Sequence, residues 1–70
     1  MKIEELQIGH KVDIQYITYT NNGYKRWLKN LEVIEFKNYG NVKFIVFKQI
    51  STGKKFEIAQ SDVKIIYRNK

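Results

Sequence analysis

The sequence contains no cysteine and no proline, and His10 is its single histidine. Without cysteine there can be no disulfide, which is a common support for a small scaffold. One histidine and no thiol also argue against a structural zinc site, which takes four nitrogen or sulfur ligands. The sequence therefore predicts a domain that is held together by packing alone, with no metal and no other cofactor.

Long apolar runs are absent as well. No stretch of the sequence approaches the roughly 18 apolar residues that would span a membrane. The first residues, 1–5, lack the apolar segment of a secretory signal. We therefore expect a cytoplasmic protein that does not act at a membrane.

Residues suited to catalysis are scarce. The chain has no thiol, and a Ser-His-Asp triad would need Ser51 or Ser61 beside His10, with no local pattern to suggest it. Glu4 and Glu5 are adjacent, so on a helix they would lie about 100° apart and could not face one substrate as a pair. The sequence therefore predicts a binding protein and not an enzyme.

The length and composition suit one small folded domain. A chain of 70 residues buries only about 60% of its unfolded surface, so its core must be thin. Hydrophobic residues make up 43% of the chain and aromatic residues 14%, which is unlike a disordered segment. We expect residues 1–70 to form a single domain.

Alternation of apolar and polar residues predicts an all-β fold. The expected strands are residues 11–20, 28–36, 42–50, 54–58 and 63–67, with turns at Asn22-Gly23, 37–41 and 51–53. Residues 3–8 suggest a short helical turn that ends at Gly9, and residues 59–62 suggest another before the last strand.

Some apolar residues do not fit a simple alternation. In the last strand, Val63, Ile65 and Tyr67 are expected on one face, opposite Lys64 and Ile66. Ile17, Ile45 and Ile66 are left over; they either cover a second layer or form an interface, and a homodimer would use such an interface.

Two stretches resemble the SH3-like family of small β-barrels. Leu6-Gln7-Ile8-Gly9-His10-Lys11-Val12 is similar to the entry into the first strand of such barrels. Residues 56–63 (Phe-Glu-Ile-Ala-Gln-Ser-Asp-Val) are similar to the fourth strand, the helical turn and the last strand. The resemblance implies a five-stranded SH3-like barrel with a short N-terminal helical turn and a helical turn before the last strand. Members of this fold bind peptides, DNA, RNA and proteins, so the resemblance implies binding without choosing the ligand.

The charge of the chain is strongly positive. Thirteen Lys and Arg residues stand against seven Asp and Glu residues, which gives a net charge of +6. Such an excess favours polyanions, chiefly nucleic acid or an acidic protein surface. Lysine, however, is also favoured by A- and T-rich codons, so the charge alone does not identify a ligand.

Basic and aromatic residues are interleaved between residues 19 and 29. The candidate binding residues there are Tyr19, Tyr24, Lys25, Arg26, Trp27 and Lys29, and a second basic set is Lys43, Lys48, Lys54 and Lys55. If residues 24–29 are extended, Lys25, Trp27 and Lys29 project from one face. Rings that stack on bases beside cations that contact phosphates suit single-stranded nucleic acid. Taken alone, Trp27 is better explained as a core residue, with the lysines in solvent.

Two functions follow from this segment. The first is a nucleic-acid-binding module, in which lysines supply affinity that depends on salt and aromatic side chains contact the bases. The second is a small regulator or inhibitor, of the kind encoded by phages or mobile elements, that docks on a larger acidic protein. Trp, Tyr and Arg are also the residue types enriched at the centres of protein interfaces.

Overall fold

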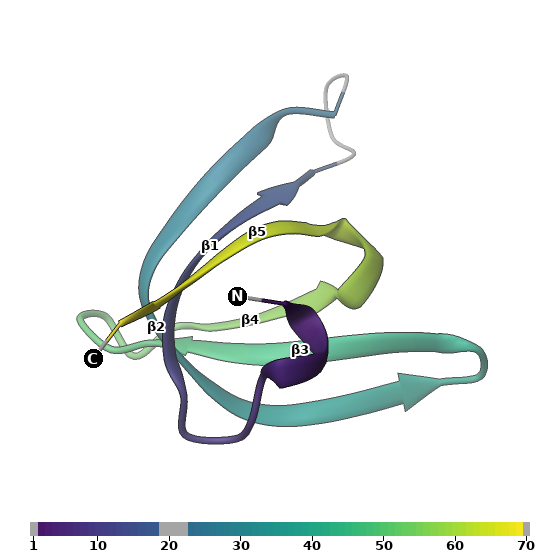
Figure 1. Ribbon diagram of the computed structural model, residues 1–70, viewed down its shortest axis with the longest axis horizontal. Helices are drawn as coiled ribbons and strands as arrows, with labels where there is room; N and C mark the ends of the chain where they lie inside the picture. Colours follow the sequence, from purple (N-terminus) through teal and green to yellow (C-terminus); the bar gives the residue numbers. More distant parts are fainter. Residues whose placement is uncertain (1, 19–22, 70) are drawn as a thin grey trace.

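The computed structural model describes residues 2–18 and 23–69 (Figure 1). The elements, in chain order, are the 3₁₀ helix η1 (Ile3–Glu5), the strands β1 (Lys11–Ile17), β2 (Lys25–Tyr39), β3 (Val42–Gln49) and β4 (Lys55–Ala59), the 3₁₀ helix η2 (Gln60–Asp62) and the strand β5 (Val63–Asn69). The predicted all-β class, the five strands and both helical turns are confirmed. Tyr19 and the predicted turn at Asn22 lie outside the described residues.

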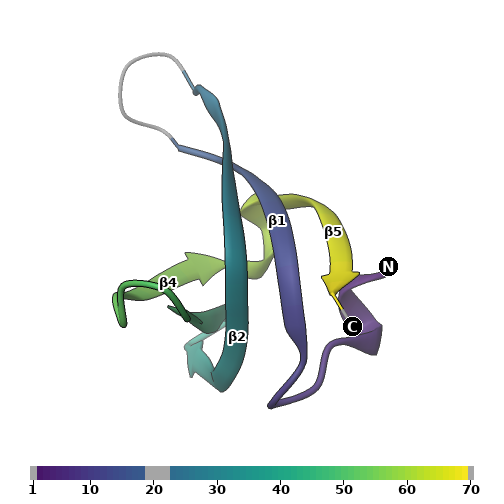
Figure 2. The same ribbon diagram turned by 90° about the vertical axis from the view of Figure 1, so that its left-hand side faces the viewer.

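The five strands form one antiparallel sheet in the order β4-β3-β2-β1-β5. Figure 2 shows that this sheet curves around, so that η2 connects one edge strand, β4, to the other edge strand, β5. Between residues 23 and 69, however, β4 and β5 do not pair with each other. The sheet is open, and the predicted closed barrel is not confirmed.

The long strand β2 belongs to both halves of the sheet. Its first half pairs with β1, from Lys25 opposite Ile17 to Glu32 opposite Lys11. Its second half pairs with β3 and ends with Tyr39 opposite Val42. The strand is longer than the predicted range 28–36, and the predicted turn at 37–41 is correspondingly shorter. No helix among the described residues is long and apolar enough to cross a membrane.

The core lies between the two halves of the curved sheet. Its buried members are Leu6, Val12, Ile14, Leu31, Val33, Ile45, Phe47, Ile58 and Ile66. Ile3 of η1 packs against this cluster and is itself partly buried. The segment that follows η1 is joined to β2 by hydrogen bonds, since Gly9 N–H donates to the Val33 carbonyl and Val33 N–H to the His10 carbonyl.

A bulge in β5 makes the expected face of that strand wrong. Ile14 lies opposite Ile66 and Gln15 opposite Ile65, but the next pair is Tyr16 opposite Val63, which leaves Lys64 as the extra residue. Val63 and Ile66 therefore share the core face, whereas Ile65 and Tyr67 are exposed. Two of the residues left over by simple alternation, Ile45 and Ile66, thus belong to the core itself.

Candidate binding surface

Trp27 and Tyr67 stack on each other on the surface of the sheet. Trp27 of β2 lies opposite Gln15 of β1, and Tyr67 of β5 lies opposite Asp13 of β1. The two rings therefore meet above β1, the strand that separates β2 from β5. Their centroids are 5.8 Å apart and their planes differ by 11°. Trp27 remains 44% exposed and Tyr67 58% exposed. Trp27 is therefore a surface residue and not part of the core.

Two lysines border this ring pair. Lys25 lies opposite Ile17, two positions from Trp27, so strand alternation places both side chains on the same side of β2. Lys29 lines a shallow pocket of about 250 Å³ together with Asp13, Trp27 and Tyr67. We call this surface, formed by Lys25, Trp27, Lys29, Tyr67 and Asp13, the aromatic face. The predicted grouping of Lys25, Trp27 and Lys29 is thus present in the structure.

The other predicted residues of this segment lie away from the aromatic face. Arg26 is opposite Tyr16, whose side chain packs toward the core, so Arg26 points to the other side of β2. Arg26 and Tyr24 are both exposed near the start of β2, where the described parts of β1 and β2 extend beyond the other strands (Figures 1 and 2). The Tyr24 carbonyl is fixed there because it accepts the Thr18 N–H at 2.9 Å.

Asp13 links the three strands beneath the ring pair. Its Oδ1 accepts the backbone N–H of Asn30 at 2.9 Å and the side-chain amide of Asn69 at 2.7 Å. Asn30 has a φ of 57° and lies where the pairing of β1 with β2 shifts by one residue. Asparagine tolerates this left-handed conformation better than most residues. Asp13 therefore holds a β2 bulge and the end of β5 in place, and it leaves one negative charge beside the rings.

The second basic set is not brought together with Trp27. Lys48 lies opposite Lys55, so these two form a cross-strand pair on β3 and β4. Lys43 lies opposite Asn38 near the other end of β3. Lys54 precedes β4, where its carbonyl accepts the Gln49 N–H in the β3–β4 turn. These lysines belong to the β3–β4 half of the sheet, whereas the aromatic face belongs to the β1–β5 half.

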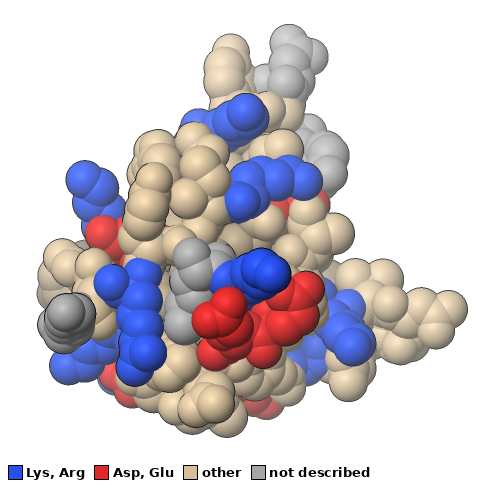
Figure 3. Space-filling model, viewed as in Figure 1, with Lys and Arg blue, Asp and Glu red and all other residues tan. Residues whose placement is uncertain are grey.

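Most of the basic side chains that the structure describes have no acidic partner within 4.0 Å. Figure 3 shows Lys and Arg in several separate groups on one side of the molecule, with the largest acidic group near the centre and smaller acidic patches beside other basic groups. Among the described residues, the single ion pair within 4.0 Å joins Lys37 to Glu57, at 3.7 Å. The pKa of Lys37 is raised above its ordinary value by electrostatic attraction to Tyr39, and then to Glu57 and Glu35. The lysines of the aromatic face carry no such pairing within the described residues.

Sequence reasoning missed Tyr67 and Asp13. Simple alternation placed Tyr67 with Val63, because a bulge at Lys64 leaves no reliable mark in the sequence. Asp13 appeared only as a polar residue of the first strand. A partial signal was present in the polar residues Asp13 and Gln15 of β1 and Asn69 of β5. Alternation places them on the outer, solvent-facing side of these two strands, which is the side that carries the aromatic face.

Comparisons of the chain with protein-family models, with curated proteins and with solved structures found no match. Within residues 2–18 and 23–69, no group of three or more His, Cys, Asp and Glu side chains is placed to hold a metal ion. The candidate site therefore has to be interpreted from its own geometry.

Proposed function

We propose that this protein is a non-catalytic module that binds nucleic acid, with single strands as the preferred form, on its aromatic face. One observation carries the proposal: two exposed rings stack in parallel, and Lys25 and Lys29 flank one of them, Trp27, on the same strand. A base has a flat apolar surface whatever its sequence, and its stacking on an aromatic side chain contributes about 1–3 kcal/mol. Lysines beside such rings attract the phosphates that flank the stacked base.

The pairing of Trp27 with Tyr67 suits this role in a second way. Each ring limits the movement of the other, so less rotational freedom is lost when a base stacks on the pair. The rings are also carried by strands of the sheet and not by a loop, which fixes their position relative to Lys25 and Lys29. The aromatic face is therefore a preorganised platform.

We also propose that the sheet is an open form of the SH3-like barrel. The strand order and the sharing of β2 by two halves of a curved sheet support this assignment. So does the helical turn η2 between β4 and β5. This fold serves many ligands, so the assignment does not by itself favour nucleic acid.

A protein partner is the second candidate, and the apolar part of the same surface favours it. Ile65 of β5 is 36% exposed. It lies on the same outer face of the sheet as Trp27 of β2, because both residues are paired with Gln15 of the strand between them. Exposed Trp and Tyr beside an aliphatic residue are typical of interface centres. A partner of this kind would be acidic, and its binding would depend on Trp27 more than on the lysines.

The test uses Trp27 as the reporter, because it is the only tryptophan of the chain. Single-stranded and double-stranded oligonucleotides are titrated into the protein at low and at near-physiological salt, with tryptophan fluorescence and anisotropy of a labelled strand as readouts. Binding should quench the fluorescence of Trp27 and should be tighter for the single strand than for the duplex. The logarithm of the binding constant should fall linearly with the logarithm of the salt concentration.

Variants then locate the site. Trp27→Ala and Lys25→Ala should each weaken the anisotropy-detected binding, whereas Tyr39→Ala should not. Tyr39 is a suitable control because it is 52% exposed and belongs to the β2–β3 half of the sheet. Absence of oligonucleotide binding at low salt would refute the proposal. That result would favour the second candidate, an acidic protein partner, and Trp27→Ala should then abolish binding of that partner.

A further inference from the structure

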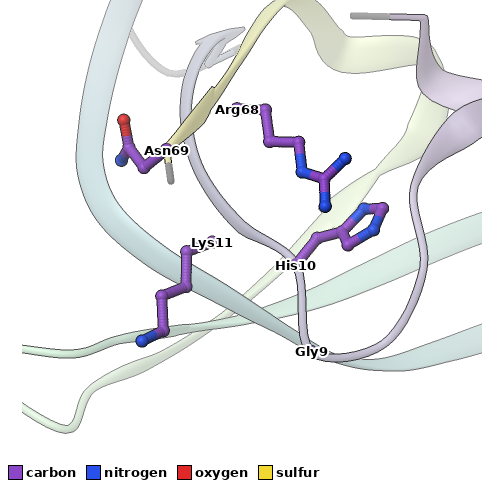
Figure 4. A pocket seen from close by; sticks show the side chains of 5 residues that line it. All are labelled: Gly9, His10, Lys11, Arg68 and Asn69. Atoms are coloured by element: carbon purple, nitrogen blue, oxygen red, sulfur yellow. The ribbon is translucent and has the colours of Figure 1, made fainter.

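A basic notch lies next to the aromatic face, where β1 begins and β5 ends. It has a volume of about 520 Å³ and is lined by Gly9, His10, Lys11, Arg68 and Asn69. Figure 4 shows Arg68 and His10 on one side of the start of β1, with the guanidinium directed toward the imidazole. Lys11 and Asn69 point to the other side. The convergent pair of side chains is therefore His10 and Arg68.

The hydrogen bonding of His10 makes it a donor toward this notch. Its Nδ1 lies 3.2 Å from the backbone nitrogen of Gln7 and accepts that N–H. In the neutral imidazole, one nitrogen accepts and the other carries the proton, so Nε2 is the protonated nitrogen of His10. His10 thus offers an Nε2–H beside the Arg68 guanidinium.

The charge of the notch suits an anion. None of the described residues that line it is acidic. Arg68 brings a positive charge beside His10, and Lys11 adds a second one on the other side of β1. The ion pair found within residues 2–18 and 23–69 involves neither of them, so no described carboxylate neutralises Arg68. An arginine fork beside an N–H donor matches the oxygens of a phosphate group.

The position of the notch connects it to the aromatic face. Tyr67 and Arg68 are consecutive in β5, so their Cα atoms are about 3.8 Å apart and their side chains leave opposite sides of the strand. β5 is an edge strand, and η1 lies beside its first part, where Ile3 lines a pocket with Val63 and Ile66. A chain of nucleotides stacked on Tyr67 would therefore reach Arg68 around the end of β5, beyond Ile66.

We propose that His10 and Arg68 bind a phosphate group, and that in the complex this is a backbone phosphate of the nucleic acid whose bases stack on the aromatic face. This inference rests on the proposed function and deepens it. The notch gives the bound strand a fixed path, from Trp27 across Tyr67 to the end of β5.

The first experiment tests the notch without nucleic acid. Inorganic phosphate is titrated against the ¹⁵N-labelled protein, with chloride at matched ionic strength as the reference. We expect saturable shifts of the amide signals of Gly9, His10 and Arg68 with phosphate and not with chloride. Equal shifts with both anions would overturn the proposal, because the notch would then respond to ionic strength alone.

The second experiment uses variants in oligonucleotide binding. Arg68→Gln should weaken single-strand binding by about tenfold at low salt and reduce the slope of log K against log salt by about 0.7, the value for one phosphate contact. Lys37→Gln removes the same charge on the β2–β3 half of the sheet and should leave the slope unchanged. Quenching of Trp27 at saturation should persist in both variants.

Two substitutions of His10 separate its binding role from its role in the turn. His10→Asn retains an acceptor near the Nδ1 position for the Gln7 N–H but removes the Nε2 donor, so it should weaken binding while the melting temperature is kept. His10→Gln retains a donor near the Nε2 position and should bind better than His10→Asn. The reverse order would overturn the donor role of His10.

The outcomes distinguish the two proposals. If the wild type binds single strands and Arg68→Gln behaves like Lys37→Gln, the notch is refuted and the aromatic face stands. If phosphate shifts the notch signals but no oligonucleotide binds, the proposed function fails and so does the assignment of the phosphate to nucleic acid. If neither binds, both are refuted.

Discussion

Asp13 should contribute more to stability than any other polar side chain of the aromatic face. Asp13→Ala removes the acceptor of two hydrogen bonds, one from the Asn30 N–H at 2.9 Å and one from the Asn69 amide at 2.7 Å. A hydrogen bond to a charged group contributes about 1.5–3 kcal/mol. One of these bonds is exposed and the other only partly buried, so water can replace part of what is lost, and we expect a total loss of about 2 kcal/mol. For a domain of this size the melting temperature should fall by about 8–16 °C.

The assay is thermal unfolding followed by circular dichroism, with Asn69→Ala and the double variant as controls. Asn69→Ala removes one of the two bonds and should cost about 1 kcal/mol. In the double variant the two losses should not add, because both remove the same Asn69–Asp13 bond. A melting temperature of Asp13→Ala within about 2 °C of the wild type, or full additivity, would refute the reasoning.

The same residue allows stability and binding to be separated. Asp13→Asn keeps an oxygen that can accept the Asn30 N–H, so it should destabilise the fold less than Asp13→Ala. It also removes the negative charge from the pocket lined by Trp27, Lys29 and Tyr67. We therefore expect Asp13→Asn to bind single-stranded oligonucleotide more tightly than the wild type. Weaker binding would indicate that the carboxylate contacts the ligand.

Three further predictions concern the rest of the fold. Phe47→Ala should lower the free energy of unfolding by about 3–5 kcal/mol, because Phe47 is fully buried. The dispersed NMR spectrum of the folded protein should then be largely lost. Phe36→Ala is the control, since Phe36 is 45% exposed and its replacement should leave the protein folded. Asn30 has a φ of 57°, which glycine adopts freely and alanine does not. Asn30→Gly should therefore change the urea midpoint little, whereas Asn30→Ala should lower stability by about 1 kcal/mol. Equal effects of the two substitutions would contradict the left-handed conformation of Asn30. The pKa of Lys37 is raised in the folded state, so its contribution is complete below the ordinary value of 10.5 and is lost as pH rises through the higher, folded value. Lys37→Gln should therefore show a smaller alkaline loss of stability in urea unfolding than the wild type.

Most of the fold could be predicted from local sequence patterns. Alternation over β1, the apolar run of β3, and the glycines that permit the turns at Gly40 and Gly53 depend on neighbouring residues alone. Closure of the barrel could not be predicted, because it depends on whether β4 and β5, which are separated by η2, come within hydrogen-bonding distance. The resemblance to SH3-like barrels does not contain that information.

The candidate site could be predicted on one strand only. Lys25, Trp27 and Lys29 are neighbours in sequence, so their common face follows from the period of a strand. Tyr67 joins them through the sheet order and through a bulge at Lys64, neither of which can be inferred from the residues around it. His10 and Arg68 are likewise brought together by the pairing of β1 with β5.

That pairing has a consequence for the order of folding. The contacts of β1 with β2, β2 with β3 and β3 with β4 each join strands that follow one another in the chain, so the loops that must close are short. β5 pairs with β1 across nearly the whole chain, with Asn69 opposite Lys11, and this closure costs the most entropy. The four-stranded meander should therefore form first and β5 dock last. The ring pair and the basic notch would then appear together, in the final step of folding.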